Sequence, residues 1–363
     1  MKSLSIALLV LALASATNWI VLVCGSEGYS NYRHHADISH AYQIVKGGGI
    51  DPDHIITDFN PFPGDDARDI YAGVVVDYEK TEVSPENLVK VLTGDESTGK
   101  KVLKSTEEDN VFLFFSDHGG ADMLAMPGGN IHSKDLLNAI QTMYDKKMYK
   151  KFDLNVVAIT AANDKESSYG WYCGSESVVK GKQVGPCLGD EFSVYWMEDA
   201  DKGEEETETL DEQFHRLVKG VTKSHVSIYG DQSFMNDVIG EYIGYPKKTA
   251  VEHQMSFETW DSRDNEMLFR LFMADHTTGK EQKKWRAAYE EEVANRKAID
   301  KYFASLTTEP RMYQDVSGVK NVNCYKSAIE QFTSTMGYSD YALKYFKVFA
   351  NICNANPKAF SGY

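Results

Sequence analysis

The chain has 363 residues, with 38 basic and 54 acidic side chains and a formal net charge of −16. This charge argues against a nucleic-acid-binding protein, which needs a basic surface. Hydrophobic residues make up 42% and charged residues 25% of the chain, a mixture typical of a folded globular protein. The length fits two domains, or one large domain with an appendage.

The first sixteen residues predict a secretory signal peptide. Lys2 precedes an apolar stretch from Leu4 to Leu13, and Ala14-Ser15-Ala16 is a small-residue ending of the signal-peptidase type. No later segment approaches the roughly 20 apolar residues that span a bilayer, so we expect no transmembrane segment. The mature chain is therefore expected to be soluble and to follow the secretory pathway.

Apolar runs alternate with amphipathic segments from residue 19 to residue 229. Trp19–Cys24 is the first continuous apolar run and predicts a buried strand. Ile38, Ala41, Tyr42 and Val45 then follow helical spacing, and Ser133 is a candidate N-cap for a second helix. The acidic segment Asp199–Glu212 is predicted to be a solvated loop, with a role in substrate selection as the alternative. The other predicted strands are residues 55–57, 111–116, 154–160 and 225–229. This pattern predicts an α/β fold with an open, mostly parallel sheet and helices on both faces.

The pattern changes near Gly279, after which only helices are predicted, at residues 285–306, 324–332 and 341–352. Such a change predicts a separate all-α domain. We therefore divide the chain into a signal peptide (residues 1–16), an α/β domain (17–278) and a helical C-terminal domain with its linker (279–363).

Five cysteines leave at least one thiol unpaired. Cys24 ends a buried strand and is expected to pack as a small apolar residue. Cys173 and Cys187 flank a loop and are expected to form a disulfide in an exported chain, with a functional thiolate at Cys173 as the alternative. The chain has no CxxC and no Cys/His cluster, so we expect no metal site and no cofactor.

The ends of the strands are where ligand sites lie in open α/β sheets. One such segment, Ser116–Gly120, places a histidine directly before two glycines. An imidazole there can move a proton beside a reacting carbonyl while the amide of Gly119 faces the oxyanion. A purely structural His118 is the alternative. The other two segments are Gly25–His35 and Thr160–Asn163, which leads into Glu166–Tyr169.

Several motifs in this order resemble the legumain family, the asparaginyl endopeptidases of the caspase-like clan of cysteine peptidases. The likeness spans nearly the whole chain after residue 16. The matching motifs are Asn31-Tyr32-Arg33-His34, Asp69–Val74, Ser116–Gly119, Thr160–Asn163, Glu166–Tyr169, Leu188-Gly189-Asp190, Tyr195–Asp199 and, in the tail, Tyr341–Leu343 and Asn351–Cys353.

The resemblance implies a role for each matching position. His118 corresponds to the catalytic histidine, Gly119 to the oxyanion-hole amide, and Asn31 to the residue that orients the histidine. Asp117 corresponds to an aspartate that can cyclise in this family. The residues that match the asparagine pocket are Arg33, Ser168 and Asp190. One guanidinium and one carboxylate suit a carboxamide, which offers an acceptor and two donors; an ordinary surface ion pair of Arg33 and Asp190 is the alternative.

One departure from the family pattern concerns the nucleophile. In the family, a buried strand ending in Glu-Ala-Cys-Glu-Ser-Gly follows the helix that ends near Lys151, whereas here Lys151 runs directly into Phe152. The nucleophilic cysteine, a pocket glutamate and a strand of about five to six residues are therefore missing. A second shortening falls between Thr57 and Gly64.

The resemblance implies a zymogen that cleaves peptide bonds after asparagine through an acyl-thioester, with ligation as a second outcome. Its partners would be proteins or peptides with an accessible asparagine, and its C-terminal prodomain would be an intramolecular inhibitor. We expect the protein to act in a lysosome-like or vacuolar compartment, or to be secreted. We also expect activation by cleavage at Asn295, which is predicted to be exposed.

Two hypotheses for this chain stay open: it is a shortened form of an active peptidase, or it is a non-catalytic binding or inhibitory protein. A lipid-anchor transamidase of the same clan fits less well, because it has a membrane anchor and lacks the prodomain.

Overall fold

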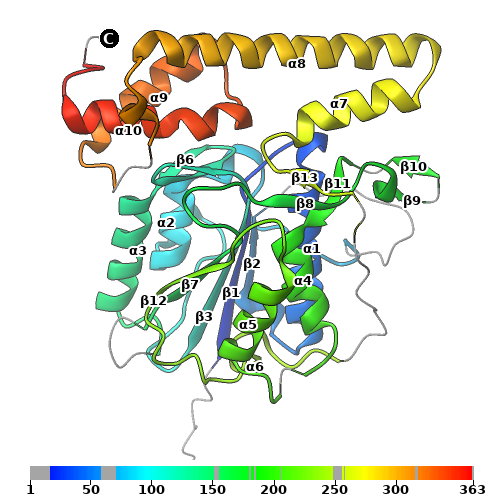
Figure 1. Cartoon of the computed structure of the whole chain (residues 1–363). Helices are drawn as coiled ribbons and strands as arrows, with labels where there is room; N and C mark the ends of the chain where they lie inside the picture. The colour runs from blue at the N-terminus through cyan, green and yellow to red at the C-terminus, as the bar shows by residue number, and fades with distance from the viewer. Residues whose placement is uncertain are drawn as a thin grey trace, which may run out of the picture.

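The computed structural model describes residues 17–58, 71–150, 155–179, 181–183, 185–204, 206–247, 256, 258–314 and 318–361. It shows an α/β domain with a helical tail across one end of it (Figure 1). The predicted signal peptide, the motif residues Asp69 and Ile70, and Phe152–Leu154 lie outside the described residues. So does most of the segment between Thr57 and Gly64, where a shortening is predicted.

The centre of the α/β domain is a parallel sheet of three strands in the order β2-β1-β3. β1 spans Asn18–Cys24, β2 spans Ile55–Asp58 and β3 spans Asn110–Ser116. β1 lies between the other two and is buried from Trp19 to Cys24. This sheet confirms the parallel arrangement predicted from the continuous apolar runs.

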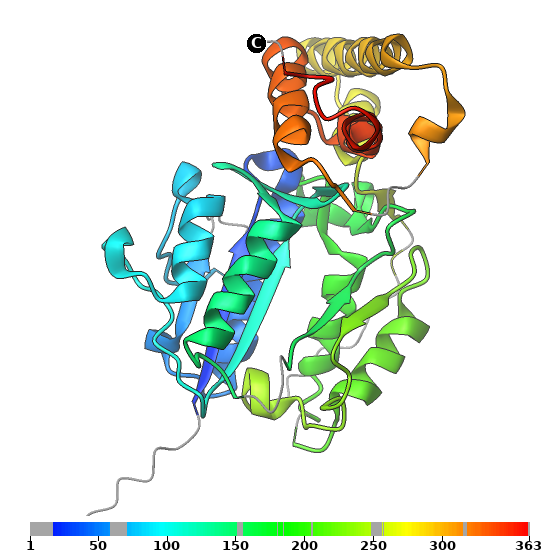
Figure 2. The same cartoon turned by 90° about the vertical axis from the view of Figure 1, so that its left-hand side faces the viewer.

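Two further predicted strands form a separate antiparallel pair, β7 (Val157–Thr160) with β12 (Ser227–Gly230). Among the described residues β3 pairs only with β1, and β7 pairs only with β12. The two groups of strands stand apart in the view of Figure 2. Leu113 of β3 is 36% exposed. The sheet is therefore divided between β3 and β7.

Helices cover both faces of the parallel sheet. α1 (Tyr32–Gly47) and α4 (Glu191–Ala200) contribute to one apolar cluster, whereas α2 (Pro85–Thr93) and α3 (Ser133–Asp145) contribute to the other. The predicted helices are confirmed, with one difference in detail. Ser133 is the first residue of α3 rather than its cap, and its hydroxyl donates a hydrogen bond to Asp122.

Shorter strands and helices surround this core. β4 (Gly119–Gly120), β5 (Met123–Met126) and β6 (Gly129–His132) form one antiparallel sheet, and β8 (Tyr169–Cys173), β11 (Cys187–Asp190) and β13 (Trp260–Asp261) form another. The remaining elements are β9 (Val178–Val179), β10 (Lys182–Gln183), α5 (Leu210–Gly220) and α6 (Gly240–Ile243).

The acidic segment Asp199–Glu212 is the predicted solvated loop only in part. Residues 202–204, 206 and 207 are exposed, whereas Asp199, Asp201 and Glu208 are buried. Arg216 of α5 pairs with both Asp199 and Glu208, and burial with the nearby Asp199 raises the pKa of Glu208 to about 8. Buried carboxylates need such partners, and Arg216 comes from outside the segment, so the composition of the segment did not reveal it.

The C-terminal part is helical, as predicted. α7 (Asn265–His276) and the long α8 (Gly279–Leu306) are followed by α9 (Val322–Met336) and α10 (Phe346–Ala355). Apolar residues of α8, α9 and α10 share one core with Met123 and Ala125 of β5, so the tail is packed onto the α/β domain. A disulfide joins Cys324 to Cys353.

Two consequences follow from these helices. Asn295, which the sequence predicts to be exposed, is half-buried in the middle of α8, so that expectation is wrong. A peptide bond inside a regular helix is a poor cleavage site because its backbone is not extended.

Among the described helices, none has the length and apolar character needed to cross a membrane.

Candidate active site

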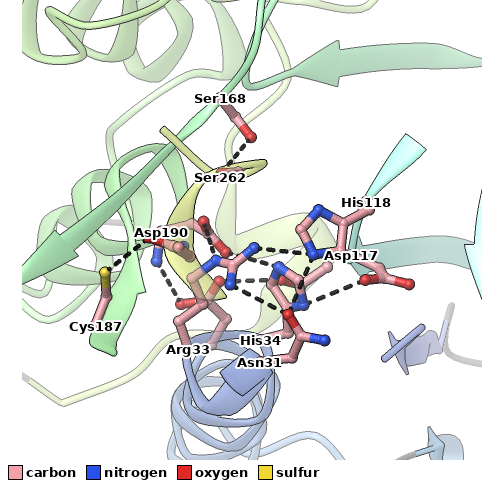
Figure 3. A network of polar contacts seen from close by, with 12 residues as sticks. Asn31, Arg33, His34, Asp117, His118, Ser168, Cys187, Asp190 and Ser262 are labelled. Atoms are coloured by element: carbon pink, nitrogen blue, oxygen red, sulfur yellow. Dashed lines mark hydrogen bonds and ion pairs between the residues drawn. The ribbon is translucent and has the colours of Figure 1, made fainter. Parts of the chain in front are cut away.

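The candidate site forms where the parallel strands end. The chain leaves β1 and enters α1 through Asn31 and Arg33, whereas Asp117 and His118 follow β3. Because β1 and β3 are parallel and in register up to Cys24 and Ser116, these two segments meet at one edge of the sheet. Figure 3 shows that their side chains point toward one another.

His118 is buried and held by three neighbours. Its Nε2 lies 3.1 Å from Oδ1 of Asn31 and 3.4 Å from Nη2 of Arg33. It also lies 3.1 Å from Oδ2 of Asp340, which comes from the helical tail. Burial lowers the pKa of His118, but the Asp340 carboxylate outweighs it, and the net pKa is above the usual value. The sequence did not predict Asp340 as a site residue, because no motif around it in the sequence indicates this contact.

Arg33 and Asp190 form a buried ion pair, with Nε 2.9 Å from Oδ1. Arg33 is 1% exposed and Asp190 is 7% exposed, so the alternative of a surface ion pair is wrong. With its amide oxygen turned toward the guanidinium, Asn265 of α7 also accepts from Arg33 at 3.0 Å. Asp37 of α1 accepts a hydrogen bond from the amide of Asp190, and burial and the Asp190 charge raise its pKa.

The other two predicted site residues, Gly119 and Ser168, lie at different distances from the cluster. Gly119 is the first residue of β4, directly after His118. Ser168 lies just before β8, and its hydroxyl contacts that of Ser262 at 3.1 Å rather than Arg33 or Asp190 (Figure 3). Ser168 is therefore a neighbour of the pocket and not in direct contact with its charged walls.

His34 and Asp117 lie beneath His118, and no role was predicted for His34. Its Nδ1 is 2.7 Å from the hydroxyl of Ser26 and 3.3 Å from Oδ1 of Asp117, and its Nε2 is 3.4 Å from Oδ2 of Asp190. Burial, with the charge of Arg33, lowers the pKa of His34 well below its usual value. Burial raises the pKa of Asp117 to about 7.

None of the cysteines is placed to act as a nucleophile. Cys173 and Cys187 form the predicted disulfide across β8 and β11, which rules out a thiolate at Cys173. Cys24 is the free cysteine of the described region, and it is completely buried, as predicted. A substrate therefore meets a histidine and a charged pocket without an accessible thiol.

The helical tail fills the space in front of the site. A cavity between Asn31, Arg263, Asn265 and the tail residues Arg296 and Asp340 holds about 10 Å³, enough for one water molecule. A larger cavity of about 690 Å³ lies at the opposite end of β1, near Trp19 and Lys101. Cavity size alone would therefore misplace the site.

Over most of its length, the chain is similar to known proteins of one peptidase family. The model of the peptidase C13 family matches residues 18–153 and 151–273, and that of the legumain prodomain matches residues 289–360. The vacuolar-processing enzyme delta-isozyme of Arabidopsis thaliana is 34% identical over 410 aligned positions, with 94% of this chain and 87% of the relative covered. Legumain of Mus musculus is 32% identical, with 93% and 89% covered. Hemoglobinase of Schistosoma japonicum is 36% identical, with 65% and 62% covered.

Proposed function

Because the chain belongs to the legumain family of cysteine peptidases, we propose that it keeps that family's histidine and two charged walls of its asparagine pocket, but neither its nucleophile nor its pocket glutamate. The observation that carries the proposal is the single cluster formed by Asn31, Arg33, His118 and Asp190, in a described region whose one free thiol is buried. The chain as written would then recognise asparagine without cleaving after it.

The pocket has the chemistry to read a carboxamide. The guanidinium of Arg33 donates to the carboxamide oxygen, and the carboxylate of Asp190 accepts from the carboxamide NH₂. Both side chains are buried, so leaving either unpaired costs more than at a surface. A substrate asparagine would have to take over part of the hydrogen bonding that Arg33 donates to Asp190 and, with its amide oxygen turned toward the guanidinium, to Asn265.

The divided sheet supports the proposal that the strand carrying the nucleophile is absent from this chain. The family model matches in two pieces that meet at residues 151–153, and the alignment to the Arabidopsis relative is longer than this chain, so that relative has segments absent here. The unpaired sides of β3 and β7 flank that junction in the chain. A strand inserted there would end at the same edge of the sheet as His118, where a thiolate could reach the substrate carbonyl.

The setting that we propose for this protein is the secretory pathway and an acidic compartment. The first sixteen residues have the signal-peptide pattern, and two disulfides fit an oxidising environment. The relatives named vacuolar-processing enzyme favour a vacuole or lysosome. The tail would be the inhibitor, because Asp340 contacts His118 and little space remains between the two domains.

The test is a cleavage assay of the full chain at acidic pH. The substrate is a peptide with one asparagine, its control has glutamine at that position, and a thiol-reactive probe locates any labelled cysteine. We expect no cleavage of either peptide. The Asp340→Asn variant, which weakens the contact of the tail with His118, is expected to bind the asparagine peptide more tightly than the glutamine peptide, and Arg33→Lys in that background should remove the preference. Cleavage that is lost in Cys24→Ala would contradict the proposal, because it would identify a working nucleophile elsewhere.

A further inference from the structure

The cluster at the carboxyl ends of β1 and β3 has a second chemical character besides that of a peptidase site. His34, Asp117 and His118 each offer one ligand atom, and these three atoms lie within 4.8 Å of one another. From this geometry we propose that the chain binds a divalent transition metal of the zinc type between these three residues, with Asp340 of the tail as the fourth ligand.

The ligand types and their positions support this proposal. Two imidazoles and one carboxylate are a common set of three protein ligands for zinc. Tetrahedral zinc holds such atoms about 3.3–3.6 Å apart, and Nδ1 of His34 already lies 3.3 Å from Oδ1 of Asp117. Oδ2 of Asp340 is 3.1 Å from Nε2 of His118, on the side of the tail. The ligand atoms of His34, Asp117 and His118 lie within 4.8 Å of one another, so closing on one ion needs side-chain shifts of roughly 1 Å.

An independent observation also points to a ligand. The side chain of Asp117 is 2% exposed, and its Oδ1 accepts no hydrogen bond although it faces His34. A buried carboxylate oxygen without a donor is costly, and a bound cation would satisfy it.

The surroundings of the ligands resemble the outer shell of a metal site. Each ring nitrogen of His34 already has a polar partner, Ser26 at Nδ1 and Asp190 at Nε2. Whichever nitrogen binds the metal, the other is therefore oriented by a neighbour, as in most metal-binding histidines. The surroundings are also acidic. Four carboxylates lie around one guanidinium, that of Arg33, and this excess of negative groups favours a cation; they are those of Asp37, Asp117, Asp190 and Asp340.

The sequence predicts no metal site because these four residues are dispersed along the chain. His34 and His118 come from two strand ends, and Asp340 comes from the tail, so no spacing motif links them. Only the parallel pairing of β1 with β3 and the packing of the tail bring them together. A metal here would join the tail to the α/β domain.

The test is metal binding by the full chain, without any assay of activity. Purified protein is stripped with a chelator and dialysed at neutral pH against Zn²⁺ for stoichiometry and affinity, and against Co²⁺ for the visible absorption of a tetrahedral site. We expect one ion per chain. His34→Gln and Asp117→Asn should each weaken binding at least about 100-fold, while Asp340→Asn should bind more weakly and change the cobalt spectrum.

The matched control is His40→Gln, which removes a part-buried histidine that pairs with a single aspartate, Asp201, away from the cluster. This variant should bind as the parent chain does. Asp117→Asn is nearly isosteric and keeps the test decisive if His34→Gln does not fold, as judged by near-ultraviolet circular dichroism. The proposal is overturned if the folded parent chain binds no ion, or if Asp117→Asn binds Zn²⁺ as tightly as the parent.

Discussion

β1 and β3 are neighbouring strands of one parallel sheet, and both are rich in large apolar side chains, yet their surroundings differ. β1 has a strand on each side and is buried from Trp19 onward, whereas β3 pairs with one strand among the described residues and carries the partly exposed Leu113. An apolar sequence of this kind is typical of a strand with two neighbours. The difference therefore shows where the sheet lacks a strand.

The same comparison separates the two sides of the site. The end of β1 leads into α1, which supplies Asn31 and Arg33 in a fully packed setting. The end of β3 supplies His118, and the next position along the sheet, where a nucleophile would lie, has no described strand. Binding and proton-transfer groups are thus present on an edge of the sheet that is incomplete.

The largest expected effect distinguishes the two strands by stability. Leu22→Ala in β1 empties a completely buried position and should lower the free energy of unfolding by about 3 kcal/mol. Leu113→Ala in β3 removes the same atoms from a residue that is 36% exposed and leaves a smaller cavity, so it should cost only about 1–2 kcal/mol. Urea denaturation of both variants measures the difference, and equal losses would show that the outer face of β3 is covered in solution.

A somewhat smaller effect is expected in hydrogen exchange. The amides of Ile20–Val23 lie on a strand paired on both sides, so they should exchange only on unfolding of the whole sheet. The β3 amides that point away from β1 should exchange roughly 100-fold faster, because a free edge opens locally. Uniform protection along β3 would contradict the divided sheet.

The smallest effect concerns how His118 is held by a contact outside the sheet. Asp340→Asn should lower the pKa of His118, whereas Asp300→Asn should leave it unchanged because Asp300 accepts from Tyr341 and Tyr345 instead. NMR titration of the imidazole protons, with a chelator present, measures both. An unchanged titration in Asp340→Asn would mean that the tail does not contact His118 in solution.

The pH dependence of this contact follows from the two pKa shifts. The pKa of His118 is raised, so its contribution to holding the tail is complete below about 6.5 and is lost as the pH rises through the raised value. The pKa of Asp340 is lowered by the charge of His118 despite burial, so its contribution is present above about 3.8 and is lost as the pH falls through the lowered value. The pair should therefore hold the tail best between these limits.

The sequence predicted the parts of this molecule that depend on local pattern. The buried strands and the helical tail follow from apolar runs and helical spacing. The strand-end motif singled out His118, and the resemblance to the legumain family grouped it with Asn31, Arg33 and Asp190, which the structure brings together. It did not predict Asp340, whose position beside His118 depends on how the tail packs on β5. Asn295 does lie within a helix that the sequence predicts, residues 285–306, but the sequence did not predict that its side chain is half-buried.

Restoring the missing strand by insertion tests directly whether its absence removes the nucleophile. An apolar segment of about six residues that ends in Glu-Ala-Cys is inserted between Lys151 and Phe152, with the same insertion ending in Glu-Ala-Ser as its control. We predict that both insertions raise the stability of the protein, and that only the cysteine form cleaves a peptide after asparagine once the tail is released. Cleavage by the chain without the insertion, or no cleavage by a folded and stabilised cysteine form, would contradict the account.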